Sequence, residues 1–414
     1  MKRQFPKFIA FFIAVMVSTM LQAAPFIGTY VVGSGETYTS LNSIINAMNT
    51  EGTSGHVTIK IKDGTYTQNI NISGISTLSE TSTLTIESNS GSASNVILRS
   101  ANSYTLYTYN VSHISFKNLT FVQPYLYQRC LYINYSNNIE FDNCVITGTT
   151  YNSSSTSYSA IYLANRCDDF TLKNCNVTEG SYGLYSTSSA KNMMIDNCTF
   201  KDHYYGLRIY YANDLTFSNN TVSNISSQGT YFYNITDIDV NNNNISSSSY
   251  NYIQNCRASS NGQAIFTNNI FHSTNSYGIR LSSTNSDLEF YHNTFLSNSS
   301  YGFYVSSTTI DMVFKNNLVA TNNCTYAMRV NEGDLQNADI DYNAYSNSSP
   351  SCDPMYNGNN LSFEEWKSIT GFDMNSVYGQ ANFVSFPADP KPQNGLFVNI
   401  CNPIAGITKD INGV

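Results

Sequence analysis

MMIDNCTF, at residues 193–200, returns 22 residues later as LTFSNNTV, at residues 215–222. Both octets have apolar residues at the first, third and eighth positions and Asn at the fifth. Because a repeat of this length cannot bury a core alone, successive copies must stack on one another. The frame occurs ten times, mostly at intervals of 22 to 26 residues, and begins at Ile114, Ile139, Phe170, Met193, Leu215, Ile238, Ala264, Leu288, Met312 and Ala338.

The spacing inside the frame indicates a strand. Apolar residues at the first and third positions alternate with polar ones, which is the period of a strand with one buried face. A second apolar motif lies between the frames, for example YGLYS at residues 182–186 and YGLRI at residues 205–209. Three short strands in each turn predict an all-β solenoid. We expect a right-handed parallel β-helix of about ten to twelve coils, with neighbouring strands ~4.8 Å apart.

The sixth position of the frame predicts an internal ladder. A position that accepts Leu and Cys must be buried, and a buried Asn must find hydrogen-bond partners. Stacked amides would satisfy one another along the rod, and the thiols would continue the column as small apolar side chains. A metal site in the thiol column is the alternative, although no His or carboxylate shares it. The column reads Leu119, Cys144, Cys175, Cys198, Asn220, Asn243, Asn269, Asn293, Asn317 and Asn343.

The ends of the chain differ from the repeats. A basic start followed by a short apolar run predicts a secretory signal peptide at residues 1–23, and no later stretch is apolar enough to span a membrane. We therefore expect a secreted or cell-surface protein. Residues 24–75 are predicted to form an N-terminal cap and the first strands, residues 76–345 the repeats, and residues 346–414 an irregular C-terminal cap region.

Each cap carries helix signals. A short N-terminal capping helix is expected after Thr39 or Ser40, with one apolar face made by Leu41, Ile44, Ile45 and Met48. Near the other end, Ser362 and Glu365 form a capping-box pattern, and the single Trp366 is expected to pack onto the last coil. One disulfide is expected in this less repetitive region, among Cys324, Cys352 and Cys401.

Composition limits the classes of partner. Charged residues make up 12% of the chain and the net charge is −8, so a basic surface for nucleic acid is not expected. Asn, Ser, Thr and 32 Tyr supply the polarity instead. No cofactor is expected. Calcium is the one metal considered, because the DID triplets at residues 237–239 and 339–341 each place two carboxylates on one face of a strand.

The repeats resemble those of secreted right-handed β-helix proteins of the pectate-lyase-like superfamily, from Ile27 to the end. GSGETYTSLNSIINAM at residues 33–48 resembles the N-terminal cap shared with pectin methylesterases, and EEWKSITGFDMNS at residues 364–376 resembles the C-terminal cap of bacterial extracellular members. The resemblance implies the fold, but this fold hosts lyases, hydrolases, esterases and adhesins. The esterase motif Gly-x-Tyr-x-Glu departs here, since it ends in Gln68.

One outward column is rich in tyrosine and arginine. Small residues such as Gly206 precede the inward positions, so a shallow trough is expected beside the large side chains. Tyr would stack on sugar rings and Arg would pair with acidic groups of a glycan, or the same side chains would only stabilise the sheet. The predicted column is Tyr107, Tyr132, Tyr162, Tyr185, Arg208, Tyr233, Gln254, Arg280, Tyr304 and Arg329, and the predicted ligand-binding residues are Tyr162, Tyr185, Arg208, Tyr233, Arg280, Tyr304 and Arg329.

Three functional hypotheses follow. The first is a protein that binds polysaccharide, including acidic glycans, along the Tyr/Arg column. The second is a polysaccharide lyase or glycoside hydrolase acting on uronic-acid polymers, whose catalytic candidates are His203, Arg208 and Arg280, because β-elimination needs a base and a cation. The third is a cell-surface scaffold or adhesin in which the aromatic side chains are purely structural.

Overall fold

The structure is a computed structural model. It describes residues 24–407 except residues 151–152, 188, 324, 332, 349–350, 394 and 396–400. The predicted signal peptide at residues 1–23 lies outside the described residues. Neither α-helix in the described part of the chain has the length and apolarity needed to cross a bilayer.

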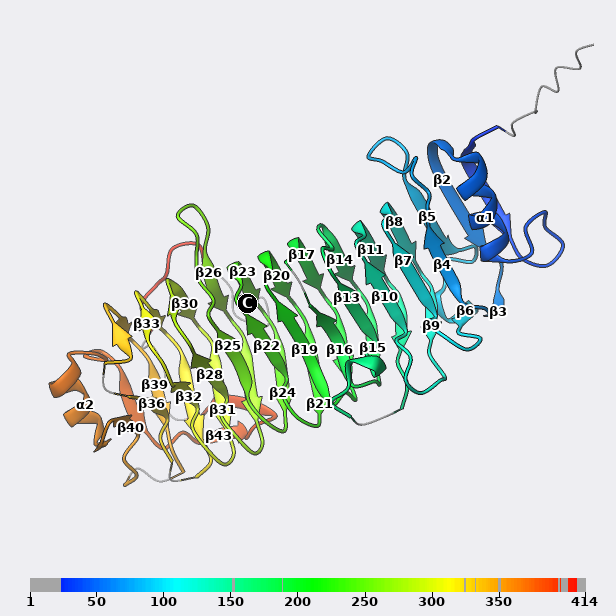
Figure 1. The fold of residues 1–414 in the computed structure, drawn as a ribbon. Coiled ribbons are helices and arrows are strands. Elements are labelled where there is room, and N and C mark those ends of the chain that lie inside the picture. The colour runs from blue at the N-terminus through cyan, green and yellow to red at the C-terminus, as the bar shows by residue number, and fades with distance from the viewer. Residues whose placement is uncertain are drawn as a thin grey trace, which may run out of the picture.

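The chain winds into a rod made of three sheets (Figure 1). Each full coil contributes one strand to sheet A, one to sheet B and one to sheet C, in that order, and consecutive coils pair in parallel. The predicted parallel solenoid is confirmed. Each sheet contains 13 strands, so the rod has slightly more coils than the ten to twelve predicted.

The strands are short and recur in each sheet. Sheet A consists of β1 (Phe26–Val32), β2 (Thr53–Ile61), β5 (Leu84–Ser88), β8 (Ser112–Lys117), β11 (Asn137–Asp142), β14 (Phe170–Lys173), β17 (Lys191–Asp196), β20 (Asn213–Ser218), β23 (Thr236–Asn241), β26 (Ala264–Thr267), β30 (Leu288–Tyr291), β34 (Val313–Lys315) and β38 (Asp339–Asp341). Sheet B consists of β3 (Gly64–Thr67), β6 (Val96–Arg99), β9 (Thr120–Val122), β12 (Val145–Thr147), β15 (Asn176–Thr178), β18 (Thr199–Lys201), β21 (Thr221–Ile225), β24 (Asn244–Ser247), β27 (Ile270–Ser273), β31 (Thr294–Ser297), β35 (Leu318–Thr321), β39 (Ala344–Ser346) and β42 (Val377–Gly379). Sheet C consists of β4 (Ile70–Ser73), β7 (Leu106–Tyr109), β10 (Leu131–Asn134), β13 (Ile161–Ala164), β16 (Tyr182–Ser186), β19 (Tyr205–Tyr210), β22 (Thr230–Tyr233), β25 (Asn251–Gln254), β28 (Ile279–Ser282), β32 (Phe303–Val305), β36 (Met328–Val330), β40 (Met355–Asn357) and β41 (Asn360–Leu361).

A few short elements lie outside these sheets. The helices are α1 (Leu41–Glu51), α2 (Phe363–Thr370) and the 3-10 turns η1 (Ala93–Asn95) and η2 (Thr156–Tyr158). The remaining strands are β29 (Asn285–Ser286), β33 (Thr309–Ile310), β37 (Leu335–Gln336), β43 (Phe383–Ser385) and β44 (Asp389–Pro392).

The repeat frame forms one wall and one corner of each coil. Its third residue lies in sheet A with a buried side chain in every copy, and its first residue does so in most copies. Phenylalanines at the third position stack along the rod. The rings of Phe116 and Phe141 lie 4.8 Å apart at an interplanar angle of 11°, and those of Phe266 and Phe290 are also 4.8 Å apart. The fifth residue turns the chain into sheet B with a positive φ, for example 51° at Asn197 and 57° at Asn219. Asn tolerates this left-handed conformation better than most residues, which explains its recurrence.

The predicted amide ladder is present at the sixth position. The Asn243 backbone N–H and side-chain Nδ2 both donate to Oδ1 of Asn269, over 3.0 and 2.9 Å. The Asn269 Nδ2 donates in turn to Asn293 Oδ1 over 2.9 Å and to the Val240 carbonyl over 2.7 Å. Each buried amide is therefore held by the coil on either side.

The thiols occupy the ladder positions with weaker versions of the same contacts. Cys175 Sγ accepts from the backbone N–H of Cys144 over 3.4 Å and donates to the Phe141 carbonyl over 3.6 Å. The first amide, Asn220, accepts from the Cys198 N–H over 2.9 Å. The three column cysteines are free thiols. No group of three or more His, Cys, Asp or Glu side chains that could hold a metal occurs in the described ranges.

The N-terminal cap agrees with the sequence pattern. Ser40 caps α1 through a capping box with Ser43, and the predicted apolar face of the helix is buried against the first coils. The C-terminal helix α2 has the predicted capping box between Ser362 and Glu365. In the C-terminal region Cys352 is disulfide-bonded and Cys401 is free, whereas Cys324 lies outside the described residues.

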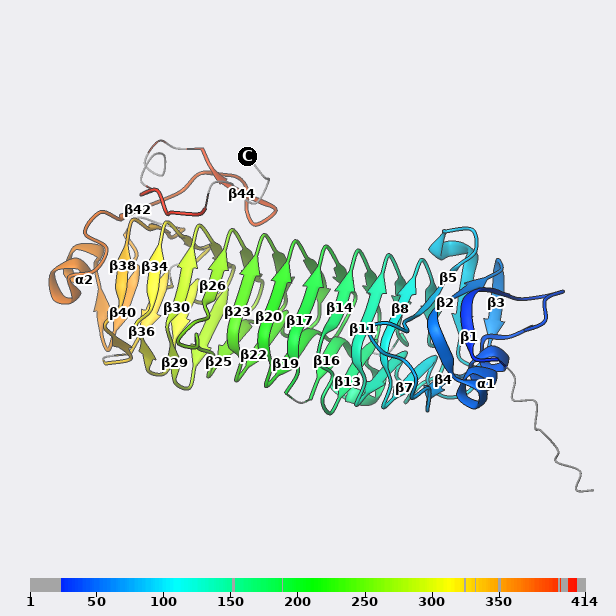
Figure 2. The same ribbon diagram turned by 90° about the horizontal axis from the view of Figure 1, so that it is seen from above.

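The ladder ends on a buried carboxylate in the C-terminal cap. Asp373 accepts hydrogen bonds from Asn343 Nδ2 at 3.1 Å, Ser376 Oγ at 2.6 Å, Trp366 Nε1 at 2.8 Å and the Tyr345 hydroxyl at 3.1 Å. Trp366 is 1% exposed, as expected for packing onto the last coil. Beyond the cap, the chain runs back along the outside of the rod (Figure 2). There Asn402 exchanges two hydrogen bonds with the Asn316 side chain.

Candidate functional site

The outer surface of sheet C carries a continuous column of large side chains. Strand pairing aligns Tyr107, Tyr132, Tyr162, Tyr185, Arg208, Tyr231, Tyr252, Arg280, Tyr304, Arg329 and Tyr356. The predicted positions of Tyr233 and Gln254 in this column are wrong. Each lies two residues further along its strand, where Tyr233 pairs with Tyr210 and Gln254. Because the shift is two residues, Tyr233 still faces outward.

The tyrosine rings of this surface pack on one another along the rod. The rings of Tyr162 and Tyr185 are 5.5 Å apart and nearly parallel, and those of Tyr231 and Tyr252 are 4.8 Å apart. The parallel contacts cover part of each ring face, whereas Tyr132 meets Tyr162 edge to face. Burial also raises the pKa of hydroxyls such as that of Tyr185, so they remain protonated donors at neutral pH.

Four arginines lie among these rings. The Arg208 guanidinium is 3.9 Å from the centre of the Tyr205 ring and donates to the Gln228 side chain. The guanidinium groups of Arg280 and Arg329 lie 5.5 and 5.1 Å from the centre of the Tyr304 ring. Sequence reasoning missed the fourth, Arg129, which lies in a loop before β10. Its guanidinium is 3.8 Å from the Tyr162 ring centre. We call this outer surface of sheet C, with its four arginines, the tyrosine–arginine face.

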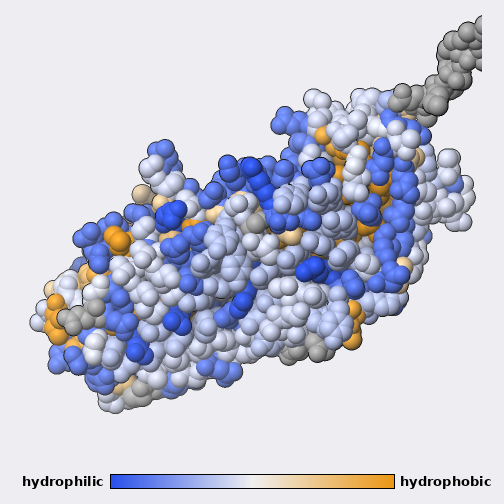
Figure 3. Space-filling view, viewed as in Figure 1, coloured by the Kyte–Doolittle hydropathy of each residue, from blue (hydrophilic) through white to orange (hydrophobic). Residues whose placement is uncertain are grey.

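The arginines of this face have no acidic partner in the described part of the chain. The ion pairs found there include one arginine, Arg166, which is bound to Asp168 at the corner between sheets C and A. Carboxylates gather instead on sheet A, where Glu140 lies between Lys117 and Lys173. The Nε atoms of Arg208 and Arg329 are buried without a hydrogen-bond partner. In the orientation of Figure 1, the front of the molecule is a weakly polar surface with scattered strongly hydrophilic patches (Figure 3).

The glycines beside the column do not line a trough, contrary to expectation. Gly206 is buried, and a Cβ there would lie 2.2 Å from the carbonyl oxygen of Gly229 in the next coil. These small residues are needed because neighbouring coils approach closely at this corner.

The predicted catalytic candidates do not form a cluster. Arg208 and Arg280 lie three coils apart, since β22 and β25 separate β19 from β28. His203 is 1% exposed, and its Nε2 lies 3.1 Å from the Val177 carbonyl oxygen. The ring is therefore buried at the corner between sheets B and C. A catalytic role for these residues remains a prediction.

Burial of His203 predicts an acid-sensitive coil. Burial lowers the pKa of the His203 imidazole to about 4. Because the folded pKa lies below the unfolded value of about 6.5, protonation favours unfolding and stability is lost as the pH falls from about 6.5 to about 4. The loss amounts to about 3 kcal/mol. Urea unfolding of the wild type and His203→Asn across this range should show a smaller acid loss in the variant. Equal losses in both proteins would contradict the assignment.

The aspartate pairs considered for calcium are already engaged in protein contacts. Asp339 pairs with Lys315, and Asp341 accepts hydrogen bonds from the backbone N–H and Nδ2 of Asn375 over 2.7 Å each. Asp237 accepts from the backbone N–H and hydroxyl of Ser259 over 2.7 and 2.8 Å. Neither pair presents two carboxylates free of protein contacts.

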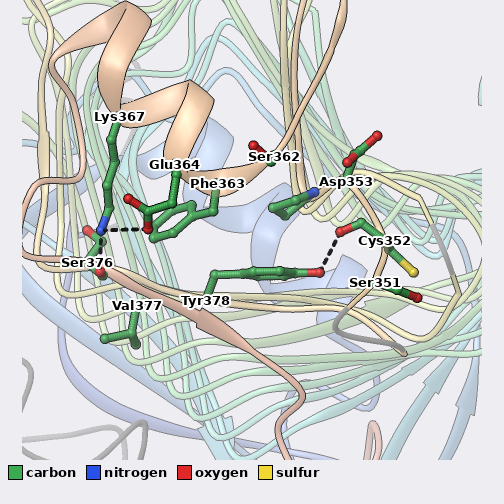
Figure 4. A pocket seen from close by; sticks show the side chains of 11 residues that line it. Ser351, Cys352, Asp353, Ser362, Phe363, Glu364, Lys367, Ser376, Val377 and Tyr378 are labelled. Atoms are coloured by element: carbon green, nitrogen blue, oxygen red, sulfur yellow. Dashed lines mark hydrogen bonds and ion pairs between the residues drawn. The ribbon is translucent and has the colours of Figure 1, made fainter.

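Clefts also lie beside the C-terminal cap and at corners of the rod. A cleft of about 480 Å³ lies beside α2 (Figure 4). There Lys367 Nζ is 3.8 Å from Glu364 and 4.5 Å from the Phe363 ring centre. The two charged side chains of α2 that line this cleft therefore form an ion pair with each other. A cleft of about 1200 Å³ separates the returning C-terminal segment from the corner of sheets A and B, and turn asparagines such as Asn242 and Asn268 line it. A third cleft, of about 430 Å³, is lined by His203 together with Glu179 and Asp202.

Residues 129–319 match the family model described as the right handed beta helix region. This match agrees with the three parallel sheets of the structure, and the fold is a right-handed parallel β-helix. No curated protein matches it in sequence.

Solved structures share the fold at low sequence identity. The chain is 13% identical to the Dettilon tailspike protein (gp208), with a TM-score of 0.46, and covers 64% of that chain with 77% of its own. Against the A-module of the Azotobacter vinelandii mannuronan C-5 epimerase AlgE6, the identity is 12% and the TM-score 0.44, with 77% and 85% covered. For bacteriophage CBA120 tailspike protein 3 the values are 12% and 0.47, with 81% and 60% covered. In the last two comparisons, the first coverage refers to this chain and the second to the other chain.

Proposed function

We propose that this protein is exported and binds an acidic polysaccharide along the tyrosine–arginine face. The observation that carries the proposal is the placement of Arg129, Arg208, Arg280 and Arg329 on one sheet, without carboxylate partners in the described structure. In a chain of net charge −8, these guanidinium groups are available to anionic groups of a ligand. Guanidinium binds carboxylate through paired, charge-assisted hydrogen bonds.

The length of the face favours a polymer. Along sheet C, Arg208 and Arg280 are three coils apart, or ~14 Å at ~4.8 Å per coil, and Arg329 lies two coils beyond Arg280. Between them lie tyrosine hydroxyls and ring edges, which suit sugar hydroxyl groups. A single chain lying along the rod axis would meet several arginines at once, and its many weak contacts would add up to useful affinity.

Affinity electrophoresis in gels containing polygalacturonate, alginate or neutral dextran tests the proposal. We expect the wild type to be retarded by the uronate polymers. Each lost charge-assisted contact costs ~1.5–3 kcal/mol, so Arg208→Gln/Arg280→Gln should bind at least about 100-fold more weakly. Arg166→Gln is the control, because it removes an arginine that is already paired with a carboxylate, Asp168. Thermal unfolding of each variant verifies that the coils remain folded.

The other outcomes decide between the hypotheses. Equal retention of the double variant and the Arg166→Gln control would refute binding along the tyrosine–arginine face. If no acidic polymer retards the protein, the hypothesis of a cell-surface scaffold or adhesin is favoured. Shortened polymer chains after incubation with the wild type would establish the lyase or hydrolase alternative, and loss of that activity in His203→Asn would implicate the buried imidazole.

A further inference from the structure

Three exposed tyrosines, Tyr127, Tyr135 and Tyr211, occupy a backbone conformation that bulky residues avoid, and the last two lie at equivalent corners between sheets C and A. Tyr135 has φ 48° and Tyr211 has φ 59°, both in the left-handed region, and their side chains are 49% and 41% exposed. The equivalent corner between sheets C and A holds Asn in most other coils with positive φ there, namely Asn110, Asn165, Asn234 and Asn255. Asn is favoured in this conformation and Tyr is an outlier.

Neighbouring rings hold both side chains in place. The Tyr135 ring lies 6.2 Å from that of Tyr109, edge to face, and the Tyr211 ring lies 5.3 Å from that of Tyr233 in the same geometry. Tyr109 is itself 44% exposed. Ring surface that the stacking on sheet C conceals is therefore presented to solvent at this border of the tyrosine–arginine face.

We infer that Tyr135 and Tyr211 form two aromatic contact sites that stack on the C–H faces of pyranose rings in the bound polysaccharide. This inference rests on the proposed function and deepens it. β13 and β16 lie between β10 and β19, so the two sites are three coils apart, ~14 Å along the rod. Strained residues persist where they serve a function, and an exposed, positioned ring is suited to an apolar sugar face.

The two classes of contact respond differently to salt. Pairing between arginine and uronate is weakened as ionic strength rises, with a screening length of about 3 Å at 1 M salt, whereas stacking is not screened. The arginines should therefore supply the salt-sensitive part of the affinity. Tyr135 and Tyr211 should supply most of what remains at high salt.

The test compares Tyr135→Asn/Tyr211→Asn with Tyr135→Phe/Tyr211→Phe, using alginate and polygalacturonate at low and about 1 M salt. The Asn variant should bind about tenfold more weakly at both salt concentrations, yet unfold at a higher temperature than the wild type because Asn relieves the strain. The Phe variant keeps the rings and should match the wild type in affinity.

Each result is decisive. If the wild type and the Asn variant bind equally while Arg208→Gln/Arg280→Gln binds weakly, the aromatic sites are refuted and the proposed function stands. If the wild type binds none of the polymers, the proposed function itself fails. An Asn variant that unfolds at a lower temperature than the wild type would overturn the argument from strain.

Discussion

Replacing Asn269 with leucine should lower the free energy of unfolding by about 3 kcal/mol or more. Leucine fills a similar volume but can neither accept nor donate a hydrogen bond. It would leave the Asn243 N–H and the Val240 carbonyl without the partners they have at 3.0 and 2.7 Å. Each buried group left unpaired costs about 1–3 kcal/mol. Urea unfolding followed by circular dichroism measures the loss.

The thiol end of the ladder supplies the matched control. Cys175 makes both ladder contacts through one sulfur atom, so Asn269→Cys should retain weak versions of them and lose only about 1 kcal/mol. Hydrogen exchange should localise the damage to the coils on either side of Asn269, because solenoid repeats interact with their nearest neighbours. If the leucine and cysteine variants were equally stable, shape rather than hydrogen bonding would govern this position.

Replacing Asp373 with alanine should undock the C-terminal cap, with a loss of about 3 kcal/mol or more. The carboxylate accepts hydrogen bonds from Trp366, Ser376, Asn343 and Tyr345. Its removal leaves several buried donors without an acceptor. Trp366 is the only tryptophan in the chain, so its fluorescence reports on the cap alone. We expect its emission to shift to the red at a lower urea concentration in the variant. Glu364→Ala is the control, since that side chain is exposed on the same helix.

The same carboxyl predicts a pH dependence of the cap. Burial raises the pKa of Asp373 to about 6, against an ordinary value of about 3.8. A raised carboxyl pKa favours the protonated form in the folded state, so the stability of the cap falls as the pH rises from about 4 to about 6. The fall is about 3 kcal/mol. Asp373→Asn should abolish this dependence, and a wild-type cap that is equally stable across the range would contradict the prediction.

The repeat made most of the fold predictable. Apolar residues at positions one and three locate the strands of sheet A, and the mixture of thiols and amides at position six indicates a buried ladder. Both signals come from side chains that every coil must place in the same surroundings. The left-handed φ of the fifth residue explains the recurring Asn, although the repeat alone shows the residue and not the dihedral angle.

The functional face was harder to predict, for reasons visible in single coils. Strand β22 carries Tyr231 and Tyr233 on the same side, so alternation alone cannot tell which belongs to the column. Arg129 lies outside the repeating motif, in a loop whose path depends on contacts such as its hydrogen bond to the Thr156 carbonyl, at 3.2 Å. His203 also precedes its strand, and only the packing of adjacent coils reveals its burial.

The amide ladder gives the rod an electrical direction. From Asn243 to Asn343, each Nδ2 donates to the Oδ1 of the next coil, and the Asn343 Nδ2 donates to the carboxylate of Asp373. The amide dipoles are therefore aligned head to tail, and such chains polarise one another. Their positive ends point toward the negative charge in the cap, as a helix dipole points toward an anion. Deleting a whole coil would shorten this dipole without reversing it, so the polarity of the rod survives changes in its length.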